Sequence, residues 1–301
     1  MQRIRLRYTK RGRLRFTSHR DFQRAFERAL RRAEVPMAYS AGFTPHPKVS
    51  YANAAPTGTG SEAEYLEIAL TEARDPEKLR ILLDESLPTG LDIVDAVEAR
   101  TSGLADRLTA SEWELRLDGV APEDAARAVE AFKASDLVEV QRRTKNGVRT
   151  FDARAAVVDL DSRDGQDAHD GHDARDGRDG SGGADGSETP RPQPAASVGS
   201  TGAAGTAPLA GPTDQPCAIL RLVVRHVTPA VRPDDVLSGL RAVADLAPPV
   251  PAAVTRLAQG LFDDETGTVT DPLAPDREAA PAPSTAEPAA AAKASAPVGP
   301  A

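Results

Sequence analysis

Residues 2–34 of the chain read QRIRLRYTKRGRLRFTSHRDFQRAFERALRRAE. In its first part Ile4, Leu6 and Tyr8 alternate with arginines, which is the two-residue period of a half-buried β-strand. From Phe22 onward the apolar side chains recur at the spacing of one face of an amphipathic α-helix. A strand followed by a helix therefore opens the fold, and the same succession recurs further along the chain.

The segment between this strand and this helix predicts a turn and a second strand. Residues 10–12 contain a glycine after two basic residues, and Leu14 and Phe16 continue the alternation, so we expect a basic hairpin. Ser18 stands three residues before an aspartate and resembles a capping box, and Pro36 would stop the helix.

The remaining elements follow from the same patterns. We expect helices over 75–86, 122–134, 233–246 and 252–261, and strands over 37–40, 49–54, 64–70, 91–97, 112–117, 137–142, 154–160 and 218–225. The order strand–helix–strand–strand–helix–strand is typical of a ferredoxin-like unit. The predicted fold class is therefore α+β, with two ferredoxin-like (βαββαβ-type) units.

Two segments have compositions that disfavour a packed core. Residues 161–215 carry an aspartate at every third position and then a run rich in Ser, Gly, Ala and Pro, and residues 263–301 are rich in Ala and Pro. Almost nothing there can be buried to offset the entropy of ordering the chain. We predict a disordered insert and a disordered tail, a basic unit over 1–100, and a second unit over 101–160 plus 216–262.

The charge of the 301-residue chain is unevenly distributed. Its 37 Lys and Arg stand against 45 Asp and Glu, which gives a net charge of −8. Residues 1–60 nevertheless hold thirteen basic and three acidic residues, a net charge of +10. Such a surface attracts phosphate backbones, and arginine forks bidentately to phosphate and stacks on bases.

The sequence disfavours several other classes of function. Cys217 is the single cysteine, which excludes a disulfide scaffold and a cysteine-built zinc or iron–sulfur site in this chain. No phosphate-binding glycine loop, GxSxG or HExxH motif occurs, so we expect no metal, no cofactor and no catalysis. The chain opens without an apolar segment and contains no run of about 18 apolar residues, so we expect a cytoplasmic protein with no membrane partner.

The predicted helix and the loop AGFTPHPK over 41–48 combine arginines, aromatic residues and a histidine between two prolines, a mixture that suits unpaired bases. The candidate nucleic-acid or anion-binding residues are Arg13, Arg15, Ser18, His19, Arg20, Arg24, Arg28, Arg31, Tyr39, Phe43, His46 and Lys48. Three readings of the basic surface stay open: nucleic-acid contact, a solvated or partner-docking face, and a small-anion site. Ser18 could equally be an ordinary helix cap, and Phe43 could pack into the core.

Four stretches carry a resemblance to a known family. They are RFTSHRD over 15–21, the arginine-rich helix over 25–33, PMAYSAGFTPHPKVSYANAAP over 36–56, and SEAEYL over 61–66. Together they resemble the radical-SAM-associated domain of unknown function, which occurs alone or fused C-terminally to a radical SAM protein. The likeness is strong over residues 1–100 and looser over the second unit. The matching positions are Phe16, Ser18, His19, Asp21, Arg24, Gly42, Phe43, Pro45, His46 and Pro47.

The resemblance implies a companion of a radical SAM protein that works in RNA metabolism, since such genes often lie near ribonuclease E/G-type genes. Radical chemistry needs three cluster cysteines, so it would reside on the partner, and no catalytic residue carries over. We therefore expect a non-catalytic accessory protein that binds RNA or another polyanion through its basic N-terminal face.

Two alternatives remain. One is a small enzyme that acts on a phosphorylated substrate at His19, Asp21 and His46, which requires all three side chains to reach one reacting centre. The other is a protein–protein adaptor that uses no nucleic acid, in which the arginines meet an acidic patch on the partner.

Overall fold

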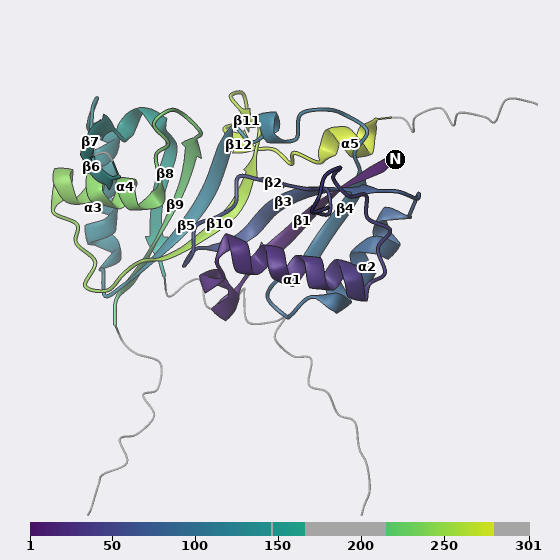
Figure 1. Ribbon diagram of the computed structural model, residues 1–301. Helices are drawn as coiled ribbons and strands as arrows, with labels where there is room; N and C mark the ends of the chain where they lie inside the picture. Colours follow the sequence, from purple (N-terminus) through teal and green to yellow (C-terminus); the bar gives the residue numbers. More distant parts are fainter. Residues whose placement is uncertain (146, 166–214, 280–301) are drawn as a thin grey trace, which may run out of the picture. The chain divides into compact units, whose positions relative to one another are not determined.

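The computed structural model describes residues 1–145, 147–165 and 215–279 (Figure 1). The chain divides into two compact units, one formed by residues 1–110 with the chain from 258 onward, and the other by residues 111–257. The mixed α+β class is confirmed. Most of the predicted insert and residues 280–301 of the predicted tail lie outside the described residues. Among the helices that are described, none is long and apolar enough to cross a membrane.

Unit 1 has the element order strand–helix–strand–strand–helix–strand. Its strands pair in the order β4-β1-β3-β2, and every pair is antiparallel. A shorter C-terminal part completes the unit. The elements are β1 (Gln2–Lys10), η1 (Gly12–Phe16), α1 (His19–Arg32), β2 (Val49–Ala52), β3 (Gly60–Leu70), α2 (Pro76–Ser86), β4 (Ile93–Glu98), η2 (Ala105–Arg107), β11 (Phe262–Asp263), β12 (Thr268–Val269) and α5 (Ala274–Glu278).

The core of unit 1 follows from the alternation in β1. Ile4, Leu6 and Tyr8 are buried as predicted, in one cluster with apolar side chains of α1 and α2. The Tyr8 ring stacks on that of Phe22, with 4.4 Å between centroids. Phe26 completes the buried face of α1 and is fully enclosed. The polar face of α1 is thereby turned away from the sheet.

The predicted N-terminal hairpin is wrong. The segment Gly12–Phe16 forms a short 3₁₀ helix, and β1 pairs with β3 on one side and β4 on the other. A strand with both edges paired has no edge left for a hairpin partner. Gly12 has φ +52, a left-handed conformation that favours glycine, and it turns the chain out of the sheet.

Unit 2 repeats the order strand–helix–strand–strand–helix–strand once a separate two-stranded ribbon is set aside. Its strands lie in the order β10-β5-β9-β8, and β6 pairs with β7 alone. The elements are β5 (Ala110–Asp118), α3 (Pro122–Ala134), β6 (Glu139–Thr144), β7 (Gly147–Asp152), η3 (Arg154–Ala156), β8 (Val157–Asp164), β9 (Cys217–Arg225), α4 (Pro233–Ala244) and β10 (Ala253–Gly260). The assignment of either unit as ferredoxin-like stays a prediction.

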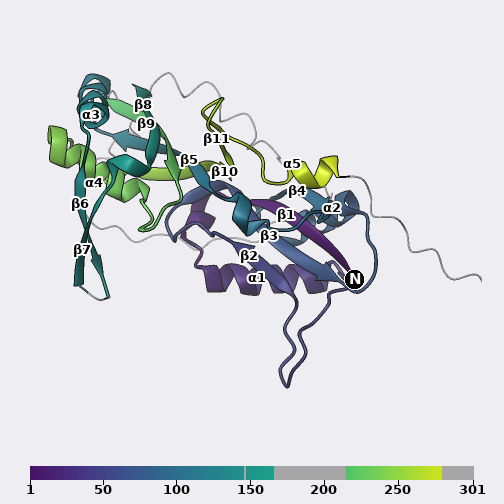
Figure 2. The same cartoon turned by 90° about the horizontal axis from the view of Figure 1, so that it is seen from above.

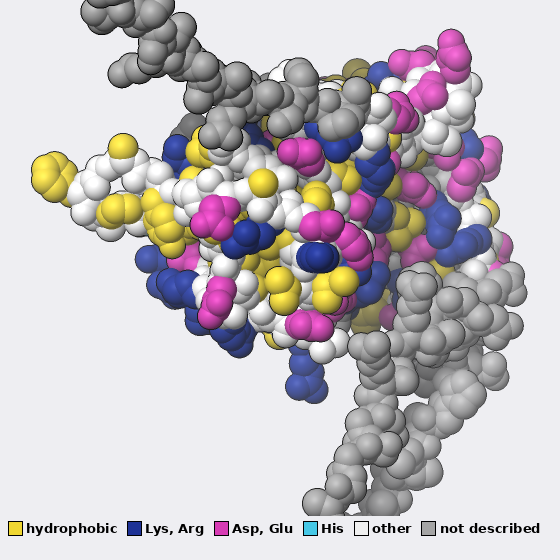
Figure 3. Space-filling view, turned by 90° about the vertical axis from the view of Figure 1, so that its right-hand side faces the viewer, with side chains coloured by type: hydrophobic (Ala, Val, Ile, Leu, Met, Phe, Trp, Pro, Cys, Tyr) yellow, Lys and Arg dark blue, Asp and Glu magenta, His cyan; other side chains and the backbone are white. Residues whose placement is uncertain are grey.

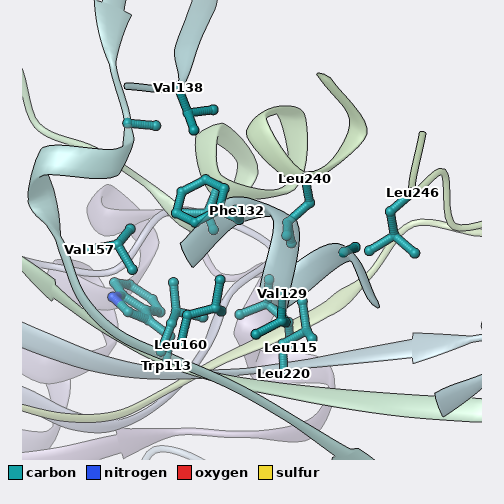
Figure 4. Close-up of a cluster of buried hydrophobic side chains, with 14 of the residues drawn as sticks. Trp113, Leu115, Val129, Phe132, Val138, Val157, Leu160, Leu220, Leu240 and Leu246 are labelled. Carbon is teal, nitrogen blue, oxygen red and sulfur yellow. The ribbon is translucent and has the colours of Figure 1, made fainter. Parts of the chain in front are cut away.

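The core of unit 2 lies between its sheet and the helices α3 and α4. Trp113 and Leu115 of β5 and Leu220 of β9 pack with Phe132 of α3 and Leu240 of α4 (Figure 4). Leu115, Phe132, Leu220 and Leu240 are fully enclosed. The helix predicted over 122–134 is confirmed at both ends, with proline at its first turn.

Several predicted elements need correction. The helix predicted over 252–261 is the strand β10, because this segment pairs with β5, and β-branched Val254 and Thr255 suit a strand. The strand β7 went unpredicted, and the strand expected over 154–160 begins with η3. The strand predicted over 37–40 is reduced to isolated bridges.

Two boundaries of the predicted disorder also shift. Residues 161–164 belong to β8, although composition placed them in the insert. The segment 263–279, assigned to the tail, contains β12 and α5, and Asp276 within it is buried. Both segments are ordered by partners elsewhere in their units, which composition does not reveal.

Candidate nucleic-acid interface

The exposed side of α1 carries five arginines. Ser18 caps the helix as the sequence indicated, because its hydroxyl accepts a hydrogen bond from the Asp21 amide at 3.2 Å. The buried side of the helix is apolar, so residues about one turn apart on the other side line up in a stripe. This stripe, the arginine face, consists of Arg20, Arg24, Arg28, Arg31 and Arg32, which are all exposed.

The arginine face is not neutralised by the protein's own carboxylates. Within the described residues, Arg24 alone among the five forms an ion pair, with Asp21 at 3.8 Å. Such an exposed pair contributes only about 0–1 kcal/mol. Arg32 instead donates to the carbonyl oxygen of Ser86. Like charges one helical turn apart cost roughly 0.2–0.5 kcal/mol per pair, so an anion bound here would relieve a repulsion that the fold maintains.

A narrow loop projects beside α1, and its base is closed by its own hydrogen bonds (Figure 2). Ser40 donates its amide to the carbonyl of His46 at 2.9 Å, and the His46 amide donates to the Ser40 hydroxyl at 3.0 Å. Gly42 has φ +146, a conformation that needs glycine. Phe43 follows it and is fully exposed, so the alternative that Phe43 packs into the core is wrong.

Figure 3 shows Lys and Arg side chains gathered beside this projecting loop, whose tip carries apolar atoms. Lys48 is exposed at the end of the loop, and Arg13 is exposed on η1. The Arg15 guanidinium lies over the ring of Phe16, 4.8 Å from its centroid, and that ring is itself 59% exposed. Cations and accessible aromatic rings therefore occur together around the start of α1 and the loop.

The loop base and the second half of α1 enclose a hollow of about 230 Å³. It brings together three of the predicted residues, Arg31, Tyr39 and His46. It also contains two acids that the sequence analysis did not select, Glu27 and Glu34. Their spacing of four and three residues from Arg31 could have placed them on the same side of the helix. The volume is below the ~300–1,000 Å³ of pockets for drug-sized ligands, so the hollow suits one small group.

His19 and Asp21 do not line this hollow. Asp21 precedes Glu27 by six residues, which is about 9 Å along a helix axis, and its carboxylate accepts a hydrogen bond from the Ser18 hydroxyl at 2.7 Å. The His19 ring packs edge-on against Tyr51, with 4.9 Å between centroids. Burial raises the pKa of Tyr51, and the charge of Glu27 raises it further, so this phenol stays neutral near pH 7. The hollow thus contains one member of the trio that an acid–base site would need.

The arginines of β1 are engaged by acceptors within unit 1, which corrects the predicted basic strand face. Arg5 is buried, and its guanidinium pairs with Glu67 at 3.0 Å and with Asp276 of α5. Arg11, just beyond the strand, pairs with Glu62. Arg5 is buried because this face of the sheet is covered within unit 1, whereas Arg11 is exposed but paired. The usable basic surface is therefore the helix and loop rather than the whole N-terminal segment.

Comparison with known proteins adds one finding. A family model described as an uncharacterized protein conserved in bacteria (DUF2344) matches residues 3–182. The matched range includes α1 and the projecting loop. No curated protein matches the chain.

Proposed function

We propose that this chain, which belongs to the DUF2344 family of uncharacterized proteins conserved in bacteria, is a non-catalytic accessory protein that binds RNA through α1 and the projecting loop. It would present this RNA to a radical SAM partner, the association that the sequence resemblance implies. The observation that carries the proposal is the arginine face, which is exposed along the whole of α1.

The arginine face has the length that a nucleic-acid strand requires. From Arg20 to Arg32 the helix spans about 18 Å, and a stacked strand presents one phosphate per ~3.4 Å, so roughly five phosphates fit along it. Guanidinium groups donate to phosphate in a bidentate fashion and release counterions on doing so. Phosphate contact of this kind is independent of sequence, so it would supply affinity rather than selectivity.

The loop would supply contacts to bases. An exposed aromatic ring on a preformed loop stacks on a base at little ordering cost, and such stacking contributes about 1–3 kcal/mol per base. Phe43 is placed in this way, on a loop whose base is closed by the bonds between Ser40 and His46. In the hollow, the carboxylates of Glu27 and Glu34 can accept hydrogen bonds from an exocyclic amine of one unstacked base.

The test is filter binding of a single-stranded RNA to the full-length protein over a series of salt concentrations. We expect binding at ~50 mM salt, with a log–log slope of roughly −0.7 per phosphate contacted. The variant Arg24→Glu/Arg28→Glu reverses the centre of the arginine face and should abolish binding. The matched control is Arg127→Glu/Lys133→Glu, which makes the same charge change on the exposed side of α3.

Two results would contradict the proposal. One is no RNA affinity of the unmodified protein at ~50 mM salt. The other is equal binding by the α1 variant and the α3 control. Purification with a co-expressed radical SAM protein adds a further measurement. A complex that carries no nucleic acid, judged from low absorbance at 260 nm, would favour the adaptor alternative instead.

A further inference from the structure

Unit 2 contains a two-stranded ribbon that belongs to neither of its layers. β6 and β7 pair from Glu139 with Asp152 to Thr144 with Gly147, and within the described residues no third strand joins them. At its base Val140 and Phe151 are buried in the core of unit 2. Beyond that base the ribbon extends away from unit 2 (Figure 2).

The outer part of the ribbon is strongly basic. The sequence between Glu139 and Asp152 holds four cations and no acid. Asp152 is already engaged, because its carboxylate accepts from the backbone amides of Val138 at 3.0 Å and Arg154 at 2.8 Å. Three of the four cations are exposed and form no ion pair with any described residue. They are Arg143, Lys145 and Arg149.

The pairing register places two of the four cations of the ribbon directly opposite each other. Arg142 lies across from Arg149, and like charges at facing positions destabilise a β-ribbon. Arg142 is held in place, because its guanidinium lies 4.7 Å from the centroid of the Phe151 ring and 3.4 Å from Asp235. Arg149 has no comparable anchor among the described residues. A bound polyanion would therefore relieve a repulsion that the ribbon otherwise maintains.

The two faces of the ribbon both carry charge. Because side chains alternate along a strand, Arg142 and Arg149 share one face and Arg143 points to the other. A flat acidic protein patch would meet only one face at a time. The two rows of phosphates that border the narrow major groove of an A-form RNA helix would meet both faces, with the ribbon placed across them rather than inside the groove.

We propose that the β6–β7 ribbon is a second phosphate-binding element, which contacts a double-helical part of the RNA. The proposal rests on the proposed function for the identity of the ligand. It rests on none of the residues of α1 or the loop. The ribbon would add affinity by phosphate contacts, while the loop would contact unpaired bases.

The experiment measures binding of the full-length protein to an RNA duplex of about 20 base pairs over a salt series. The variant Arg143→Ala/Lys145→Ala/Arg149→Ala removes the exposed cations of the ribbon. At ~0.1 M salt we expect its affinity to fall roughly tenfold or more, and the log–log slope to become shallower by about 2. The control Arg127→Ala/Lys133→Ala/Arg241→Ala removes the same charge from α3 and α4 and should bind within about twofold of the unmodified protein.

A second variant separates the loss of charge from a disturbance of the ribbon's structure. Arg143→Lys/Arg149→Lys keeps the charges, and it should retain binding with an unchanged salt slope. An equal loss of binding in this variant and in the alanine variant would show that the ribbon acts by its shape rather than by its charge, and would overturn the proposal.

The two proposals fail in different ways. Unchanged duplex binding by the ribbon variant, with loss of single-strand binding by the α1 variant, overturns the ribbon proposal and leaves the proposed function in place. Unchanged single-strand binding by the α1 variant, with loss of duplex binding by the ribbon variant, supports the ribbon and overturns the role of α1. A weaker affinity for each variant, with a larger loss for the two combined, supports both. No RNA affinity of the unmodified protein overturns both.

Discussion

Asp276 holds the short helix α5 against the rest of unit 1. Its carboxylate accepts hydrogen bonds from the Thr101 hydroxyl at 2.6 Å and amide at 2.9 Å, and it pairs with Arg5 and Arg107. Burial raises the pKa of Asp276, but the hydrogen bonds from Thr101 and Arg5 outweigh burial, so its pKa lies below the usual value. Asp276 is thus charged in the folded protein, and together with Glu67 it balances the buried charge of Arg5.

Replacing this carboxylate should destabilise unit 1. Asp276→Asn keeps the shape but removes the carboxylate that faces both Arg5 and Arg107, so that Arg5 retains the carboxylate of Glu67 alone, and breaking a buried pair in this way costs up to about 3–5 kcal/mol. Urea unfolding measures the difference. The control is Glu278→Gln, which removes an exposed carboxylate from the same helix and should change stability by less than about 0.5 kcal/mol. Equal stability of the two variants would contradict the role assigned to Asp276.

The pH dependence of the unfolding free energy tests the same contribution of the Asp276 carboxylate to stability. The folded pKa of Asp276 is lowered, so its stabilising effect is complete above the unfolded value of ~3.9 and is lost as the pH falls through the folded pKa. The stability gap between Asp276→Asn and the unmodified protein should therefore be constant near pH 7 and should narrow below about pH 4. A gap that widened with acidification would contradict this account.

At the scale of elements, the projecting loop couples a rigid base to an accessible tip. The hydrogen bonds between Ser40 and His46 close the base, and the Phe43 side chain is fully exposed rather than packed against the described part of the protein. Phe43→Ala should therefore leave the unfolding free energy unchanged. Under the proposed function it should weaken single-stranded RNA binding by about 1–3 kcal/mol, measured by filter binding. The control Leu137→Ala shortens another exposed apolar side chain, and an equal effect on binding would contradict a role in stacking.

On the scale of the whole molecule, each unit has its own apolar core. The single tryptophan, Trp113, lies in the core of unit 2, so its fluorescence reports on that unit. Leu240→Ala removes a fully enclosed side chain from the same core and should lower the stability seen by this signal by about 2–5 kcal/mol. The exposed substitution Leu137→Ala serves as the control. A transition unchanged by Leu240→Ala would contradict the packing of α4 against this core.

Much of this architecture could be predicted from local sequence alone. Periodicity is a local property, so the alternation of Ile4, Leu6 and Tyr8 and the spacing of Phe22 and Phe26 determine a strand and a helix without reference to the rest of the chain. The cap at Ser18 and the arginine face follow from the same short segment. The charge of the outer ribbon is also present in the sequence, although its meaning depends on the register of β6 with β7.

The tertiary structure decided which residues each charged side chain contacts. Arg5 and Arg28 have the same chemistry, yet Arg5 is buried against Glu67 and Asp276 whereas Arg28 is exposed. These carboxylates come from residues 62 and 271 positions away along the chain, and no local pattern encodes such a contact. The strand β10 and the order in 263–279 depend on distant partners in the same way. Whether a charge is available to a ligand is set by long-range packing, because only packing determines which side of an element meets solvent.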